Sequence, residues 1–92
     1  MIKRANVIVS GTVQGVNFRW YAKRKALALG ITGWVRNTPD GKVECEFQGS
    51  EENVDQMIEI IKSGPPSASV DDVQIKWFDE DPDLIFFQVR TA

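Results

Sequence analysis

The sequence predicts an α+β domain in which two helices cover one face of a β-sheet. Three observations indicate this: several segments alternate apolar and polar residues, two segments have helical composition or spacing, and glycine or proline turns separate them. A chain of 92 residues is long enough for one hydrophobic core and short for two. We therefore expect a single domain over residues 1–92.

The first predicted strand and the first predicted helix are joined by a glycine-containing loop. Residues 4–13 (RANVIVSGTV) place Ala5, Val7 and Val9 on one side, which is the period of a β-strand. Residues 18–29 (FRWYAKRKALAL) are rich in helix-forming residues and are followed by a glycine, a common helix stop. The sequence therefore predicts a strand that leads into a helix.

The apolar face of this helix is incomplete. Trp20 and Leu27 lie nearly opposite that face, and the sequence does not show what covers them. The residues that share the apolar face are Phe18, Ala22, Ala26 and Leu29.

A β-hairpin is predicted next, with strands at residues 31–37 (ITGWVRN) and 42–49 (KVECEFQG). The four residues between them, TPDG, have proline early and glycine late, as in a tight turn. Cys45 lies at an apolar position of the second strand. We expect it to be a small buried residue rather than a reactive thiol, because the chain contains no histidine to activate it.

The second predicted helix has the clearest helical pattern in the chain. Ser50 is a good N-cap, and Glu51 and Glu52 suit the positive end of a helix. Gly64 and the prolines after it end the helix. The apolar residues at helical spacing are Val54, Met57, Ile58 and Ile61.

Two further strands are predicted at residues 70–78 (VDDVQIKWF) and 84–90 (LIFFQVR), with an acidic turn at 79–83 between them. The element order is therefore β-α-β-β-α-β with an extra C-terminal strand, which is a ferredoxin-like α/β sandwich. Since the strands alternate apolar and polar residues, we expect an antiparallel sheet covered on one face by the two helices.

Composition and charge narrow the class of protein. Eleven basic and thirteen acidic residues give a formal net charge of −2, which argues against nucleic acid or an anionic membrane as the main partner. No apolar run approaches the roughly 20 residues of a membrane span, and the N-terminal segment lacks the features of a signal peptide. A single cysteine gives no disulfide framework. We expect a cytoplasmic enzyme or binding module.

The loop between the first strand and the first helix, in the segment GTVQGVNFR (11–19), has the features of an anion site. A glycine-containing turn at a helix N-terminus points several main-chain N–H groups into one concavity at the positive end of the helix dipole. Gly15 permits such a turn, and Arg19 in the first helical turn can bind an oxyanion with two parallel hydrogen bonds. The alternative is an ordinary loop with a solvated arginine. The Walker A and Rossmann patterns are absent.

The same segment resembles the signature of the acylphosphatase family, G-x-V-Q-G-V-x-F-R, at every fixed position. The family's second segment, G-x-V-x-N, is matched by GWVRN at residues 33–37. The segment SGPPSASV at 63–70 is similar to the family's connection from helix to strand. The resemblance covers essentially the whole chain, and two motifs at the right separation are more specific than either motif alone.

The resemblance implies an enzyme that hydrolyses acyl phosphates to a carboxylate and inorganic phosphate, without metal or other cofactor. It implies that Arg19 binds the phosphate and that Asn37 is a catalytic residue that positions the attacking water. The implied substrate is a small-molecule acyl phosphate. We also expect inorganic phosphate or sulfate to inhibit by occupying the loop, and we expect a monomer because that is the default for a chain of this size. The residues whose main-chain amides are implied to hold the phosphoryl oxygens are Gly15, Val16, Asn17, Phe18 and Arg19.

Two other classes of protein remain as alternatives. A nonenzymatic ferredoxin-like module that binds an anion would use the same loop, but it leaves GWVRN unexplained. An RNA-binding sheet expects a basic strand with aromatic residues, whereas residues 42–49 contain two glutamates. Outside the motifs, Asn37 has the features of a turn former, and we assign Trp34 and Trp77 to sheet packing.

Overall fold

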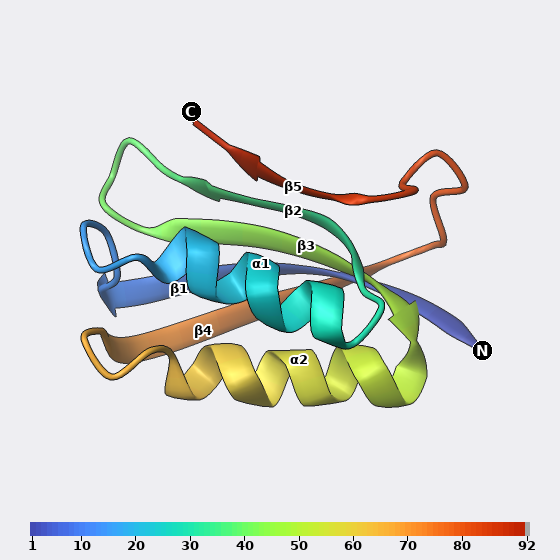
Figure 1. The fold of residues 1–92 in the computed structure, drawn as a ribbon, viewed down its shortest axis with the longest axis horizontal. Coiled ribbons are helices and arrows are strands. Elements are labelled where there is room, and N and C mark those ends of the chain that lie inside the picture. Colours follow the sequence, from blue (N-terminus) through green and yellow to red (C-terminus); the bar gives the residue numbers. More distant parts are fainter. Residues whose placement is uncertain (92) are drawn as a thin grey trace.

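The computed structural model describes residues 1–91, which form five strands and two helices. Figure 1 shows the helices side by side in one layer and the sheet in a second layer behind them. The predicted element order is confirmed. The elements are β1 (Ile2–Thr12), α1 (Phe18–Ala28), β2 (Thr32–Asn37), β3 (Val43–Ser50), α2 (Glu51–Ser63), β4 (Ser69–Phe78) and β5 (Phe87–Arg90).

The sheet has the strand order β4-β1-β3-β2-β5. The contacts β1–β3, β1–β4 and β2–β3 are antiparallel, as expected, but β5 lies parallel to β2. The sheet is therefore mixed rather than wholly antiparallel. The topology gives the reason: β4 ends at the end of the sheet where β2 starts. Figure 1 shows the chain passing along that end of the sheet to the far edge, so β5 runs in the direction of β2.

The core fills the space between the sheet and the two helices. Ala5, Val7 and Val9 are fully buried on the helix side of β1, as their alternation predicted. The apolar stripe of α2 is buried, as predicted: Val54, Met57, Ile58 and Ile61. From α1, the buried residues are Phe18, Ala22 and Ala26, while Leu29 is partly buried against the core. The two remaining apolar residues of α1, Trp20 and Leu27, are exposed.

The C-terminal strand is shorter than the predicted residues 84–90. The main chain turns at residues 81–84, where the Leu84 N–H donates to the Asp81 carbonyl oxygen, and the strand begins only at Phe87. The side-chain amide of Gln48 and the main chain of Asp81 exchange two hydrogen bonds of 2.8 Å each. These bonds hold the crossing segment against the end of β3, so contact with β2 begins only where the Gly33 N–H donates to the Phe86 carbonyl oxygen at 3.0 Å.

The sheet face that no helix covers is polar, and its side chains contact one another. The indole N–H of Trp34 donates to Glu46 at 3.2 Å, and the guanidinium of Arg90 lies 4.4 Å from the centre of the Trp34 ring. The expected sheet-packing role of Trp34 is confirmed. Trp77 lies on the other face: it is paired with Ala5 on the helix side of the edge strand β4 and is half-exposed, with the ammonium of Lys3 4.7 Å from its ring centre.

Within residues 1–91, no helix is long and apolar enough to cross a membrane. Cys45 is fully buried, and this burial raises the pKa of its thiol. The expectation of a buried structural cysteine is therefore confirmed.

Candidate functional site

The two helices begin in different ways. In α2, the Ser50 hydroxyl accepts a hydrogen bond from the Asn53 N–H at 3.2 Å, and two glutamates occupy the first turn. In α1, the N-cap residue Asn17 makes no side-chain capping bond, and the first turn contains no acidic residue. The positive end of α1 is therefore left without a negative group from the protein, which is the condition for binding an external anion.

The loop before α1 contains two residues with left-handed backbone. Gly15 has φ 74°, and Asn17 is the non-glycine residue with positive φ, at 62°. A Cβ added at Gly15 would meet no atom within 4 Å, so the glycine is required here by its backbone angle. Within residues 1–91, the main-chain N–H groups of 15–19 donate to no protein acceptor. Left-handed residues in a turn before a helix are typical of a concave arrangement of N–H groups.

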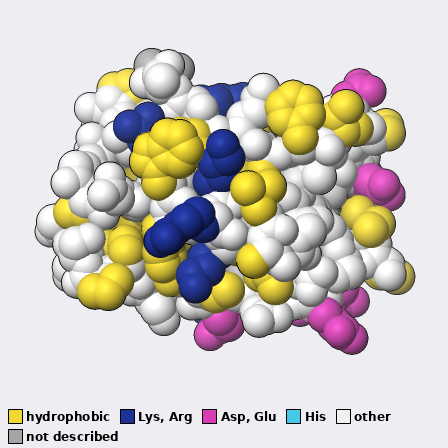
Figure 2. Space-filling view, viewed as in Figure 1, with side chains coloured by type: hydrophobic (Ala, Val, Ile, Leu, Met, Phe, Trp, Pro, Cys, Tyr) yellow, Lys and Arg dark blue, Asp and Glu magenta, His cyan; other side chains and the backbone are white. Residues whose placement is uncertain are grey.

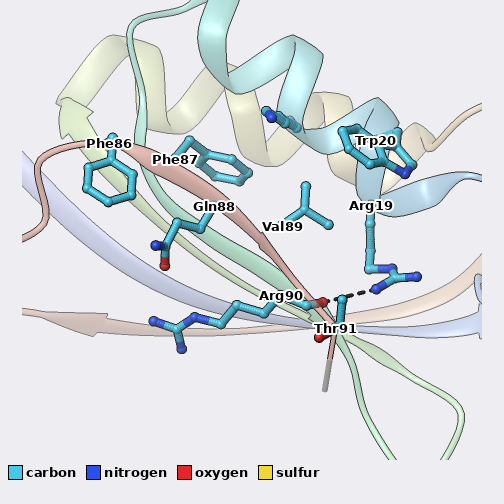
Figure 3. Close-up of a pocket in the computed structure, with 9 residues that line it drawn as sticks. Arg19, Trp20, Phe86, Phe87, Gln88, Val89, Arg90 and Thr91 are labelled. Carbon is cyan, nitrogen blue, oxygen red and sulfur yellow. Dashed lines mark hydrogen bonds between the residues drawn. The ribbon is translucent and has the colours of Figure 1, made fainter.

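Arg19 lies in the first turn of α1 and reaches the end of β5. Its Nη1 donates to the carbonyl oxygen of Arg90 at 3.0 Å, and Figure 3 shows the side chain extending from the helix toward that oxygen. One of five guanidinium N–H groups is used in this bond. The bond orients the guanidinium and leaves its other N–H groups for an anion.

Asn37 is the last residue of β2 and borders the same hollow as the first residues of α1. Along β2 it alternates with Gly33 and Val35, both buried on the helix side, so its side chain projects from the same face. Asn37 is partly buried, yet its side chain makes no hydrogen bond to another residue within residues 1–91. A free amide at the end of the sheet is available to a ligand or a water molecule.

The loop, Arg19 and Asn37 border one hollow of about 180 Å³. Most of the residues predicted for the site are thus brought together by the fold. Val16 is the exception, since it packs against the hydrophobic core and borders a different hollow. The residues that line the site are Val13, Gly15, Asn17, Phe18, Arg19, Trp20 and Asn37.

Two polar residues that the sequence analysis did not identify hold this site together. Nε2 of Gln14 donates to the carbonyl oxygens of Thr38 and Lys42, both at 2.8 Å. The hydroxyl of Ser67 donates to the carbonyl oxygen of Val16 at 3.0 Å. The first pair of bonds fixes the anion loop to the β2–β3 turn, directly after Asn37. Gln14 lies within the motif GTVQGVNFR, so its position in the signature was the available signal.

The β2–β3 turn is also braced from within. The Thr38 hydroxyl donates to the Asp40 carboxylate and accepts from the Lys42 N–H at 3.0 Å. The hydrogen bond from Thr38 holds the pKa of the Asp40 carboxyl below its ordinary value. These contacts give the residue before the turn, Asn37, a defined position.

Positive charge gathers on the helix that begins at the site. Figure 2 shows Lys and Arg side chains grouped over the N-terminal part of α1, whereas Asp and Glu lie toward the right-hand and lower edges of the same view. The sequence of α1 contains four basic residues and no acidic one: Arg19, Lys23, Arg24 and Lys25. A chain with a net charge of −2 therefore presents a locally positive surface beside the loop, which favours the approach of anions.

Among residues 1–91, no group of three or more His, Cys, Asp or Glu side chains is arranged to hold a metal ion. The positive groups that the site offers are main-chain N–H groups and a guanidinium. The arrangement is suited to a tetrahedral oxyanion with a water molecule beside it.

Comparisons with known proteins agree with this geometry. The family model named Acylphosphatase matches residues 5–89. An acylphosphatase of Anaeromyxobacter dehalogenans is 46% identical over 87 residues, which are 95% of this chain and 94% of that protein. An acylphosphatase of Caldivirga maquilingensis is 48% identical over 88 residues, with 95% and 93% covered. The crystal structure of acylphosphatase from Bacillus subtilis is similar with a TM-score of 0.92 at 31% identity, over 98% of this chain and 99% of that chain. From these matches over nearly its whole length, the chain belongs to the acylphosphatase family.

Proposed function

We propose that this chain hydrolyses the carboxyl–phosphate bond of acyl phosphates without a metal ion. In this proposal the main-chain N–H groups of residues 15–19 and the guanidinium of Arg19 bind the phosphoryl group, and Asn37 orients the attacking water. The observation that supports it most strongly is the uncapped N-terminus of α1, with Arg19 and Asn37 on the same hollow. Membership of the acylphosphatase family supports the reaction type.

The chemistry requires positioning and positive charge. Phosphoryl transfer passes through a loose transition state with negative charge on the equatorial oxygens and with the attacking and leaving oxygens in line. Main-chain N–H groups and Arg19 stabilise that charge through donors that are already fixed by the fold. The Arg90 carbonyl fixes the guanidinium before substrate arrives, so little reorganisation is needed.

The water molecule attacks phosphorus while the bond between phosphorus and the acyl oxygen breaks. The electrons of that bond leave with the carboxylate, which is a good leaving group and needs no strong general acid. The amide of Asn37 accepts or donates a hydrogen bond to the water but is a very poor base. The chain contains no histidine. We therefore assign one proton of the water to a phosphoryl oxygen of the substrate while the other stays on the attacking oxygen, so that dihydrogen phosphate is released.

The remaining expectations follow from this assignment. Inorganic phosphate and sulfate occupy the loop and compete with substrate, since both are tetrahedral oxyanions of the kind that the N–H groups bind. The proposal requires no cofactor and no macromolecular partner. The monomeric state and the cytoplasmic location stay predictions from the sequence.

The test is a progress curve with benzoyl phosphate, with and without EDTA and with increasing inorganic phosphate. We expect turnover that EDTA does not reduce and competitive inhibition by phosphate. Loss of activity in EDTA that magnesium restores would contradict the metal-independent mechanism. Phosphate binding without any turnover would instead indicate the nonenzymatic anion-binding module.

A further inference from the structure

Packing against the hydrophobic core does not explain the position of Trp20. It follows Arg19 directly in the first turn of α1, and about 55% of the residue is exposed, whereas the neighbouring Phe18 is 2% exposed. A large aromatic side chain contributes most to stability when it is fully buried. Trp20 keeps about half of its surface in water. It borders the hollow of about 180 Å³ that also contacts Arg19 and Asn37, which we call the anion hollow.

Trp20 borders three hollows that meet at the start of α1. The first is the anion hollow, with Arg19 and Asn37. The second is a groove of about 790 Å³ between α1 and the end of the chain, which Arg19 also borders. The third, of about 450 Å³, lies between α1 and the prolines Pro65 and Pro66. The second groove has the size of a typical small-molecule site and shares Arg19 and Trp20 with the anion hollow.

The walls of this α1–β5 groove are partly apolar. Figure 3 shows Trp20 above and Val89 below the space between α1 and β5, with Arg19 at the end next to the Arg90 carbonyl. The ammonium of Lys23 lies 5.2 Å from the centre of the Trp20 ring, which orients the ring and adds positive charge to the groove. An apolar surface beside a cation suits an aromatic group that leaves as a carboxylate.

The chemistry of the proposed substrate requires such a place. In an acyl phosphate the acyl carbon is joined to the phosphoryl group through a single bridging oxygen. When the phosphoryl group occupies the loop, the acyl group must therefore lie next to the anion hollow, within reach of the residues that border it. We infer that the α1–β5 groove is the acyl subsite, in which Trp20 and Val89 contact a planar aromatic or apolar acyl group. This inference rests on the proposed hydrolysis of acyl phosphates.

The test compares kcat/KM for benzoyl phosphate with kcat/KM for acetyl phosphate, whose acyl group is too small to cover the ring. The Trp20→Ala variant should lower the benzoyl-to-acetyl ratio by about five-fold or more, the size of a lost aromatic contact. Leu27→Ala is the matched control, because Leu27 is on the same helix, is 59% exposed and borders none of the three hollows. We expect Leu27→Ala to leave the ratio unchanged.

A binding measurement separates the subsite from catalysis. Phenylphosphonate should inhibit the wild-type chain more strongly than methylphosphonate does, and Trp20→Ala should reduce that preference. An unchanged benzoyl-to-acetyl ratio in a folded Trp20→Ala variant would overturn the subsite. A wild-type chain that dimerises through this face, with Trp20→Ala remaining monomeric, would also overturn it. If the wild-type chain hydrolysed neither substrate, the proposed function itself would fail instead.

Discussion

Replacing Gln14 by alanine should reduce both stability and turnover, because Gln14 ties the anion loop to the turn that follows Asn37. Its Nε2 donates two hydrogen bonds of 2.8 Å, to the carbonyl oxygens of Thr38 and Lys42. Each of these oxygens also accepts a main-chain N–H, at 3.2 Å and 2.9 Å respectively. The variant therefore loses two ordinary bonds without leaving an acceptor unpaired.

Two such bonds contribute about 1–3 kcal/mol to the free energy of unfolding. In a domain of this size a loss of 1 kcal/mol lowers the thermal midpoint by about 4–8 °C. We therefore expect the midpoint of Gln14→Ala to fall by roughly 10 °C. We also expect kcat to fall about ten-fold, equivalent to about 1.4 kcal/mol, because the turn no longer holds Asn37 in one place.

The assay measures the thermal midpoint, kcat and the inhibition constant of phosphate on one preparation. Gln56→Ala is the control, because Gln56 is exposed on α2 and its side chain makes no hydrogen bond within residues 1–91. The control should match the wild-type chain. A Gln14→Ala variant with the wild-type midpoint and the wild-type kcat would refute a role for this bridge.

Three further changes test the groups around the loop. Arg19→Lys should weaken phosphate inhibition and lower turnover, each by about ten-fold or more, because an ammonium group cannot form two parallel hydrogen bonds from one plane. Near-normal kinetics in this variant would mean that Arg19 is only a surface charge. Asn17→Gly should keep the phosphate affinity, because glycine readily adopts the φ of 62° found at this residue. Asn17→Val should lose that affinity and lower the free energy of unfolding by about 1–2 kcal/mol. Equal phosphate inhibition constants in the two variants would contradict the proposed binding of phosphate by the main-chain N–H groups. The Asp40 pKa is depressed below 3.8 by the Thr38 hydroxyl, so its contribution to stability is present at neutral pH and disappears as the pH falls through and below that value. Thermal midpoints at pH 7 and pH 3 should therefore differ less in Asp40→Asn than in the wild-type chain.

The helices were predicted well from the sequence because their signals are local. Ser50 caps α2 as expected, and Gly64 follows its last residue with positive φ. Similarly, the periodicity of β1 predicted its buried side. Strand direction and strand length were harder to predict, because they depend on contacts between residues far apart in the sequence. Parallel pairing of β5 with β2 follows from where β4 ends, and the late start of β5 follows from the bonds between Gln48 and Asp81.

The candidate site was predicted from two motifs, whose residues the fold brings onto one hollow. The uncapped N-terminus of α1 could be anticipated from the absence of acidic residues in its first turn. The bridge made by Gln14 and the bond from Arg19 to the Arg90 carbonyl could not, since each joins residues far apart in the sequence. The exposed Trp20, for which the helical pattern gave no partner, borders the groove that we propose as the acyl subsite.

The central claim is that phosphate binding and water positioning belong to different residues, and the Asn37→Ala variant tests it most directly. Losing a group that acts on the way to the transition state should lower kcat by roughly 10²–10³-fold, about 3–4 kcal/mol, while the inhibition constant of phosphate stays near the wild-type value. If Asn37 only formed the turn, the variant would lose about 1 kcal/mol of stability and keep its kcat per folded molecule. Measuring the thermal midpoint, kcat and phosphate inhibition together distinguishes the two results. A destabilised but fully active Asn37→Ala variant would contradict the account.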